Sequence, residues 1–311
     1  MRVRLATRSS PLARWQADHV ANLLRLAVPG TEVELVEVST EGDRRADVPI
    51  AELGGQGVFV KEVQQAVLDG RADAAVHSAK DLPASAGAPG LVMAAVPERG
   101  DPRDALVGCR LDDLPPGARV ATGSARRRVQ LAHRRPDLTF AGLRGNLDRR
   151  LAAAADHSAV VVAAVAIARL GRTPETVDLL SPTVMVPQVG QGALAVECRD
   201  DDRSLRDALA AVEHAPSRRA VDAERSYLAT LGGGCDLPVG AYAVIGDGGT
   251  VTIRAVLGSH DGHVLLHTEV TGADPVAVGS EAAHRLLDGA GGRALLFAFP
   301  GHAGRPPELS R

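Results

Sequence analysis

A cysteine follows three consecutive glycines in the segment LGGGCDLPVG, residues 231–240. Each glycine weakens a helix or strand interior by about 0.5–1 kcal/mol relative to alanine, but it lets the backbone approach a bulky group closely. We therefore interpret Cys235 as a point of covalent attachment. The alternative is a small buried residue beside a tight turn, which is a common environment for an isolated cysteine. We expect Cys109 and Cys198 to be packing or surface thiols without a chemical role.

A second candidate lies in the loop HSAKDLP, which follows the predicted strand ADAAVHS. Open α/β sheets place their sites at the carboxyl ends of strands, and Lys80 and Asp81 lie in such a loop. Asp81 could act as a general acid or stabilise a cation on a substrate. It could instead cap the turn that follows. We predict that the neighbouring His77 is packed or hydrogen-bonded rather than a base.

The basic residues are unusual in both type and position. Of the 35 lysines and arginines, only Lys61 and Lys80 are lysines. The segment 119–150 is rich in arginine and contains only two acidic residues, Asp137 and Asp148. A guanidinium stays charged and can donate two parallel hydrogen bonds to a carboxylate. This segment therefore predicts a site for a ligand with several carboxylates or phosphates.

The first half of this segment predicts a strand, GARVATG, followed by a helix, SARRRVQLAHRR. Ser124 takes the N-cap position, and Arg126 and Arg127 lie in the first turn. Free N–H groups and the positive end of the helix dipole would attract an anion there. Because successive helical residues point about 100° apart, Arg126, Arg127 and Arg128 cannot all face one pocket.

The second half repeats this arrangement. The strand LTFAGL precedes a helix that we expect to begin at about Asn146. Arg144 lies just before this helix and Arg150 lies one turn into it. Two such junctions with several arginines each strengthen the prediction of an anionic ligand.

The remaining pattern predicts an α/β protein. Strand-like and helix-like segments alternate at first, which is typical of a largely parallel sheet, and a second α/β unit covers about residues 100–188. Later segments such as TVTIRAVLG and HVLLHTEV are separated by glycine-rich turns and predict antiparallel hairpins. Two helices, near 204–213 and 217–231, precede these hairpins, and a helix near 274–288 completes a small α+β domain.

Composition narrows the function classes. A length of 311 residues suits two or three domains. A formal net charge of −3 and only seven aromatic residues argue against a nucleic-acid-binding surface. We find no signal peptide, no apolar run long enough to span a membrane and no zinc-ligand spacing, so we expect a soluble cytoplasmic protein without a metal site.

The order of the motifs resembles that of the porphobilinogen deaminase family, also called the hydroxymethylbilane synthases. The resemblance runs from about Val3 to beyond Val239 and is carried by the segments ATRSSPLA, GGQGVFVKE, HSAKDLP, SARRR, LRGN, VGQGALAVECR and GGGC. It implies a transferase of tetrapyrrole and heme biosynthesis. Such an enzyme condenses four porphobilinogens head to tail, releases four ammonia molecules and hydrolyses off hydroxymethylbilane. The growing chain of pyrrole rings is built on a dipyrromethane cofactor, which a cysteine holds through a thioether. Cys235 matches the position of that cysteine.

The resemblance also assigns roles to individual residues. Asp81 matches the family's catalytic aspartate, which binds pyrrole N–H groups, stabilises cationic intermediates and assists proton movement. Every pyrrole carries an acetate and a propionate, so the growing chain needs many carboxylate-binding groups. The expected cofactor-binding residues are Ser78, Lys80, Thr122, Ser124, Arg126, Arg127 and Arg144. The expected substrate-binding residues are Arg8, Ser10, Arg150 and Arg169. Phe59 could stack near the pyrroles or pack in the core.

The family's architecture implies two α/β domains that resemble type II periplasmic binding proteins, hinged over a cleft, and an α+β domain that carries the cysteine. We expect domain 1 to comprise residues 1–98 and 190–212, domain 2 residues 99–189 and domain 3 residues 213–311. The family precedent is a monomer.

Several positions depart from the family's common pattern. Gln56 replaces the usual lysine, Glu52 stands where a basic residue is often found, and Glu41 replaces an arginine. Gly123 lacks a hydroxyl that the common pattern has. Since the changes at Glu41, Glu52 and Gln56 remove positive charge from residues 41–57, they predict weaker substrate binding than in a lysine-bearing relative.

Two other classes of protein fit part of the sequence. A non-catalytic, bilobal anion-binding protein could use the arginines, but it has no need for Cys235 and usually carries an export signal. A nucleic-acid binder could use residues 119–150, although the net charge and the few aromatic residues disfavour it.

Overall fold

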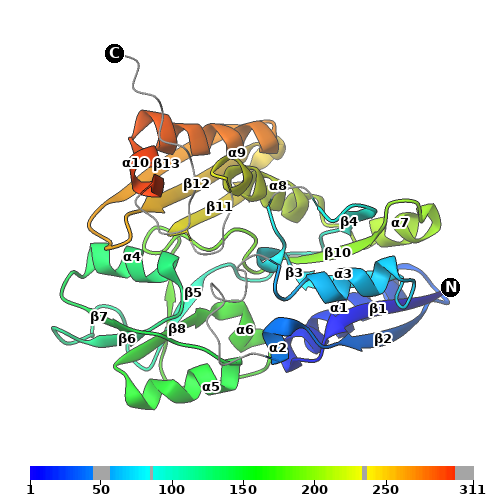
Figure 1. Ribbon diagram of the computed structural model, residues 1–311, viewed down its shortest axis with the longest axis horizontal. Helices are drawn as coiled ribbons and strands as arrows, with labels where there is room; N and C mark the ends of the chain where they lie inside the picture. Colours follow the sequence, from blue (N-terminus) through cyan, green and yellow to red (C-terminus); the bar gives the residue numbers. More distant parts are fainter. Residues whose placement is uncertain (45–56, 85–86, 233–236, 298–311) are drawn as a thin grey trace.

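The computed structural model describes residues 1–44, 57–84, 87–232 and 237–297. These residues form two five-stranded sheets and one three-stranded sheet, each covered by helices (Figure 1). The strand orders are β2-β1-β3-β10-β4, β7-β6-β8-β5-β9 and β11-β12-β13. This arrangement confirms the predicted α/β class, with two α/β units and a small α+β unit.

The first sheet contains β1 (Arg2–Arg8), β2 (Glu32–Val38), β3 (Ala74–Ser78), β4 (Leu91–Ala95) and β10 (Leu194–Arg199). The helices of this part of the chain are α1 (Pro11–Ala27), α2 (Glu41–Arg44), α3 (Lys61–Leu68) and α7 (Arg203–Ala210). Ser10 begins α1 as its N-cap and accepts a hydrogen bond from the backbone N–H of Ala13. The apolar face of α1 then packs on the sheet through Ala17, Val20, Ala21 and Leu24.

The second sheet contains β5 (Asp104–Val107), β6 (Arg119–Ala121), β7 (Thr139–Ala141), β8 (Ala159–Ala163) and β9 (Val177–Leu180). Its helices are α4 (Ala125–Arg134), α5 (Leu147–Ala152) and α6 (Ala164–Arg169). All five residues of β8 are buried, as expected for a central strand covered on both faces.

Each five-stranded sheet is largely parallel, as expected, because four of its five strands run in one direction and a single strand is reversed. In each five-stranded sheet two neighbouring pairs are parallel and two are antiparallel. The antiparallel members are β10 and β5, which follow the two points where the chain crosses between the sheets. Hydrophobic periodicity does not reveal strand direction, so the sequence pattern could not show this reversal.

The C-terminal sheet contains β11 (Val239–Ile245), β12 (Val251–Gly258) and β13 (Leu265–Gly272). The helices α8 (Ala215–Thr230), α9 (Pro275–His284) and α10 (Gly292–Phe297) accompany it, and α9 covers its outer side in Figure 1. Both predicted hairpins are present and antiparallel. The turn at Gly262 (φ 79°) packs on α4, and Arg128 donates to the carbonyl oxygen of His260. Of the three consecutive arginines, Arg128 is therefore the one that faces away from the other two.

A buried ion pair joins the crossover after β4 to α8. Both guanidinium Nη atoms of Arg99 donate to the fully buried carboxylate of Glu224, the closer at 2.6 Å. The same carboxylate accepts hydrogen bonds from the backbone N–H groups of Gly190 and Ala243. The Glu224 carboxylate thus links α8 to β11 and to both segments in which the chain crosses between the five-stranded sheets. Across the described ranges, no helix combines the length and apolar character needed to cross a membrane.

Candidate functional site

The first arginine-rich junction forms as predicted. Ser124 is the N-cap of α4, and its hydroxyl oxygen accepts from the backbone N–H of Arg127. Thr122 precedes it and accepts from the N–H of Ser124 at 3.2 Å. Both hydroxyl groups retain their own O–H donor while they shape the junction.

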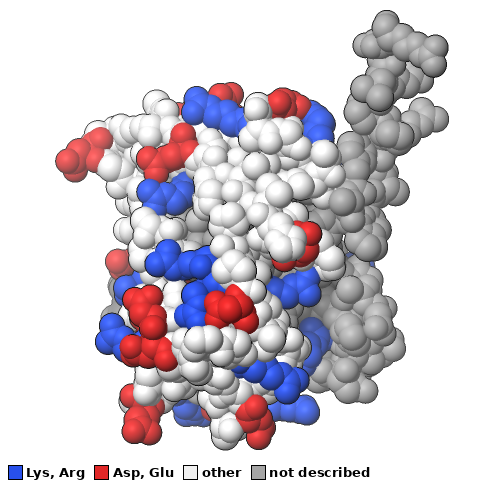
Figure 2. Space-filling view, turned by 90° about the vertical axis from the view of Figure 1, so that its left-hand side faces the viewer, with Lys and Arg blue, Asp and Glu red and all other residues white. Residues whose placement is uncertain are grey.

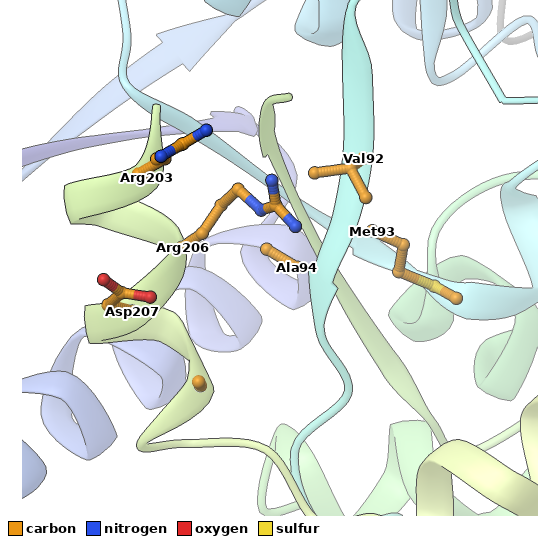
Figure 3. A pocket seen from close by; sticks show the side chains of 7 residues that line it. Val92, Met93, Ala94, Arg203, Arg206 and Asp207 are labelled. Carbon is orange, nitrogen blue, oxygen red and sulfur yellow. The ribbon is translucent and has the colours of Figure 1, made fainter. Parts of the chain in front are cut away.

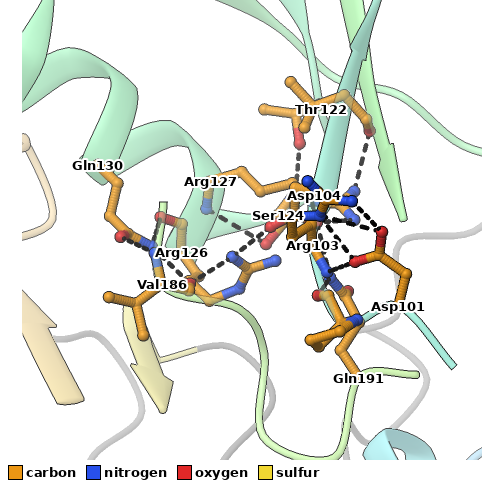
Figure 4. Close-up of polar contacts among 12 residues, drawn as sticks. Asp101, Arg103, Asp104, Thr122, Ser124, Arg126, Arg127, Gln130, Val186 and Gln191 are labelled. Atoms are coloured by element: carbon orange, nitrogen blue, oxygen red, sulfur yellow. Dashed lines mark hydrogen bonds and ion pairs between the residues drawn. The ribbon is translucent and has the colours of Figure 1, made fainter. Parts of the chain in front are cut away.

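Arg126 and Arg127 converge on one carboxylate inside the protein, that of Asp104 on β5 (Figure 4). Arg126 Nη1 donates to Asp104 Oδ2, and Arg127 Nη2 donates to Asp104 Oδ1, both at 2.7 Å. Backbone carbonyls of Val186 and Val161 accept further hydrogen bonds from the two guanidinium groups. The two arginines hold the pKa of the Asp104 carboxyl well below its usual range, although burial opposes them.

This buried cluster contains two positive charges and one carboxylate. Within the described residues, Nε and Nη2 of Arg126 are buried and have no hydrogen-bond partner. Buried guanidinium donors without partners are costly, and an anion would satisfy them. Gly240 of β11 lies against Arg126, because a Cβ atom at Gly240 would be 3.2 Å from Arg126 Cδ. The donor set therefore fits a ligand carboxylate next to the strand that follows the cysteine segment.

The loop after β3 brings Lys80 and Asp81 to the same region. It forms a single 3₁₀ turn, Ala79–Asp81, anchored by the hydrogen bond from Ala79 N–H to the carbonyl of Ala193. Gly190 (φ 72°) makes this close approach possible, since a Cβ atom there would lie 2.9 Å from the backbone nitrogen of Lys80. Burial lowers the pKa of Lys80 to about 8, while Asp81 opposes this shift.

Asp81 is half-buried, and its carboxylate accepts no hydrogen bond from the parts of the chain that the structure describes. Ser78, three residues earlier, accepts from the side-chain amide of Gln16 at 2.9 Å. His77 is buried, and its Nε2 lies 3.2 Å from Glu197 Oε2. The predicted packing of His77 is therefore confirmed.

The second junction also forms, and it adds positive charge beside the first. Asn146 is the N-cap of α5, as predicted. Arg150 Nε donates to the carbonyl of Gly145, and burial, with the nearby charges of Arg127 and Arg144, lowers the Arg150 pKa to about 10. Asp81 acts in the opposite direction on the same group. The loop of the first sheet and both junctions of the second sheet therefore share one electrostatic environment.

Gly123 explains how closely the two junctions approach. A Cβ atom at this position would lie 2.5 Å from the carbonyl oxygen of Leu143. Real Cβ atoms do not approach a backbone oxygen so closely, so the absence of a side chain is a packing requirement here.

Of the other predicted substrate residues, Arg169 joins α6 to the first unit, whereas Arg8 and Phe59 contact each other within the first unit. The guanidinium of Arg8 stacks over the ring of Phe59 at 4.1 Å from its centroid. Arg169 lies on α6 above Trp15 of α1, 5.3 Å from the ring centroid, and donates to the carbonyl of Gly192 at 2.7 Å. Cation–π contacts of this kind are worth about 0.5–2 kcal/mol.

Several predicted positions lie outside the described residues, namely Cys235, Glu52 and Gln56. The elements on either side of Cys235 are α8 and β11, which contact each other. Cys198 is buried, and burial raises its thiol pKa to about 11, whereas Cys109 is half-buried.

The sequence interpretation missed Asp104, Gln191 and Arg225. Gln191 is fully buried and donates to Asp104 Oδ1 at 3.0 Å and to the carbonyl of Pro102 at 2.7 Å. An acidic residue that opens the apolar strand DALV was the one available signal for Asp104. No local pattern distinguishes Arg225 from the other arginines of α8.

One surface hollow lies away from the predicted site residues. A shallow hollow between α7 and β4 is lined by Val92, Met93, Ala94, Arg203, Arg206, Asp207 and Ala210 (Figure 3). Its charged side chains are exposed, and it contains none of the predicted site residues. On the face displayed in Figure 2, basic and acidic side chains are interspersed.

The fold and the site together define a class: an α/β protein of two linked units, in which the second unit buries two arginines around one aspartate. Two family profiles match the chain. One is described as porphobilinogen deaminase, dipyromethane cofactor binding domain, over residues 3–207, and the other as porphobilinogen deaminase, C-terminal domain, over residues 219–288. The chain belongs to the porphobilinogen deaminase family.

Individual relatives agree with this assignment. The chain is 46% identical to a porphobilinogen deaminase of Syntrophus aciditrophicus, with 94% of this chain and 97% of the relative covered. It is 43% identical to a porphobilinogen deaminase of Brevibacillus brevis, with 93% and 95% covered. Among solved structures, the methionine-binding protein MetQ is 14% identical, with 72% of this chain and 94% of MetQ covered and a TM-score of 0.42.

Proposed function

We propose that this chain is a hydroxymethylbilane synthase that condenses four porphobilinogens on a dipyrromethane primer and then releases the product by hydrolysis. The observation that carries the proposal is the buried cluster of Arg126, Arg127 and Asp104. The Arg126 side chain, which carries the unpartnered guanidinium atoms, lies against Gly240 of β11. The charges of Arg127 and Asp104 both act on Lys80, in opposite directions. A carboxylate of the primer or the substrate would satisfy the unpartnered guanidinium donors.

The residues that would bind the cofactor's carboxylates come from the units of both five-stranded sheets, whereas Cys235 lies between α8 and β11 in the sequence. Cys235 would form the thioether, while Arg126, Arg127, Arg144 and Lys80 would bind its carboxylates. The hydroxyl groups of Ser78, Thr122 and Ser124 would donate further hydrogen bonds. When bound, the cofactor supplies a pyrrole with a free α-carbon as the acceptor for the first substrate ring.

Asp81 is the group proposed to act on the reacting rings. Its half-buried carboxylate can accept hydrogen bonds from pyrrole N–H groups and stabilise the cation that forms when ammonia leaves. It can also hold the proton that the acceptor α-carbon loses. Arg8, Ser10, Phe59, Arg150 and Arg169 are proposed to bind substrate, with Arg8 oriented by its stacking on Phe59.

The same proposal covers the finer organisation of the protein. Domain 1 would comprise residues 1–98 and 190–212, domain 2 residues 99–189 and domain 3 residues 213–311. We further propose that the enzyme works as a cytoplasmic monomer.

The test is a parallel assay of porphobilinogen consumption and ammonia release by the wild-type protein and two variants. We expect one ammonia per porphobilinogen consumed and hydroxymethylbilane as the product. Asp81→Asn should lower the rate by about 10²–10⁴-fold, as expected for loss of a proton-transferring group. Asp18→Asn, which alters an exposed carboxylate on α1, should leave the rate unchanged. Binding of porphobilinogen without ammonia release would instead favour the non-catalytic anion-binding protein.

A further inference from the structure

Arg225 connects α8 directly to the loop that carries Asp81. Its Nη2 donates to the carbonyl oxygen of Pro83 at 2.8 Å, and its Nη1 lies at 3.5 Å from that of Leu82. These carbonyls belong to the two residues that follow Asp81 in the chain. A planar guanidinium that reaches adjacent carbonyls restricts the backbone more than a single hydrogen bond does.

Apolar packing supports the same contact. Val221 lies one turn before Arg225 on α8, hence on the same face of the helix. It belongs to a buried cluster with Ala79 and Leu82, the residues on either side of Lys80 and Asp81. The face of α8 that carries Val221 and Arg225 therefore covers the turn from which Asp81 projects.

Acidic residues lie near Arg225 and favour its charged form. Burial lowers the pKa of Arg225, whereas Glu197 and Asp222 raise it. Glu197 lies on β10, accepts a hydrogen bond from Gln64 and contacts His77 at the end of β3. Arg225 is thus part of a polar cluster that fixes the loop from the strand before it and from the helix above it.

We infer that Arg225 is a positioning residue that sets the location of the Asp81 carboxylate for the condensation step. The inference rests on the proposed function, because it assigns Arg225 a role through Asp81. It also links two parts of the site, since α8 ends at Thr230, shortly before the cysteine segment.

The experiment compares Arg225→Gln and Arg225→Lys with a matched variant, Arg219→Gln. Arg219 is also on α8 and also donates to two backbone carbonyls, those of Gly249 and Ala273, but both belong to the C-terminal unit. The measurements are intact mass, thermal midpoint, and kcat and KM for porphobilinogen. We expect the two glutamine variants to lose similar thermal stability and all variants to keep the covalent cofactor.

The values of kcat and KM then test whether Arg225 positions Asp81. Arg225→Gln should lower kcat at least tenfold with KM changed less than twofold. The variant misplaces the Asp81 carboxylate, which does not bind the substrate's carboxylates in the ground state. Arg225→Lys should recover part of kcat, since an ammonium can still donate to one carbonyl. A kcat for Arg225→Gln within twofold of that for Arg219→Gln would overturn the inference. A wild-type protein that releases no ammonia would instead overturn the proposed function, and that result is seen before any variant is measured.

Discussion

Replacement of Asp104 by asparagine would remove the one negative charge that lies between two buried guanidinium groups. Asp104 is fully buried and accepts from Arg126 and Arg127 at 2.7 Å each. Removal of one partner from a buried ion pair costs about 3–5 kcal/mol, because the remaining charge is left without compensation. With a urea m-value of about 2 kcal/mol/M, the unfolding midpoint should fall by about 2 M.

The sign of the pH dependence follows from the direction of the pKa shift. The arginines lower the pKa of Asp104, so its stabilising contribution is complete above the unfolded value of about 3.9. This contribution is lost as the pH falls through the lower, folded value. Wild type and Asp104→Asn should therefore differ most at neutral pH and converge in strong acid.

Urea unfolding at pH 7, followed by circular dichroism, measures the effect. The control is Asp137→Asn, which also breaks a carboxylate–arginine pair, that with Arg135, but at the surface. Exposed pairs contribute little to stability, so this control should resemble wild type. An Asp104→Asn midpoint equal to that of the control would refute the reasoning.

Three further predictions concern the same site. Gly123→Ser should lower the thermal midpoint, because its Cβ would lie 2.5 Å from the Leu143 carbonyl oxygen. Gly142→Ser, which has open space around it, should leave the thermal midpoint unchanged. Equal midpoints for the two variants would contradict the packing argument. The pKa of Lys80 is about 8, and only its protonated form attracts carboxylates, so kcat/KM for porphobilinogen should decline as the pH rises through about 8. Lys80→Arg should remove that decline. An unchanged pH profile in the variant would show that Lys80 is not the group responsible for it. Gln56→Lys should lower KM by adding positive charge near an anionic substrate, and an identical KM would show that this position does not contact it.

The parts of the site that were predictable are those with a local signal. Ser124 and Asn146 stand immediately before their helices, where a side-chain oxygen can bond the free N–H groups, so both junctions follow from the sequence. The hairpins were predictable because a glycine-rich turn between two strand-like segments is also a local signal. The sequence pattern identified Cys235 as an attachment point and Asp81 as a possible acid, and the family resemblance added their specific roles.

The rest depends on contacts between distant segments. Asp104 precedes its partners Arg126 and Arg127 by more than twenty residues and meets them only when β5 lies beside β8. Arg225 meets the Asp81 loop across a separation of about 140 residues. The antiparallel insertion of β10 likewise needs the whole crossover. None of these contacts leaves a periodic or local trace in the sequence.

The most direct test of the central claim is the intact mass of freshly purified protein beside that of a Cys235→Ser variant. The account predicts that wild type is heavier than its sequence by two porphobilinogen-derived rings, and that the variant carries no addition. If wild type shows no addition, even after incubation with porphobilinogen, the proposed cofactor attachment is contradicted.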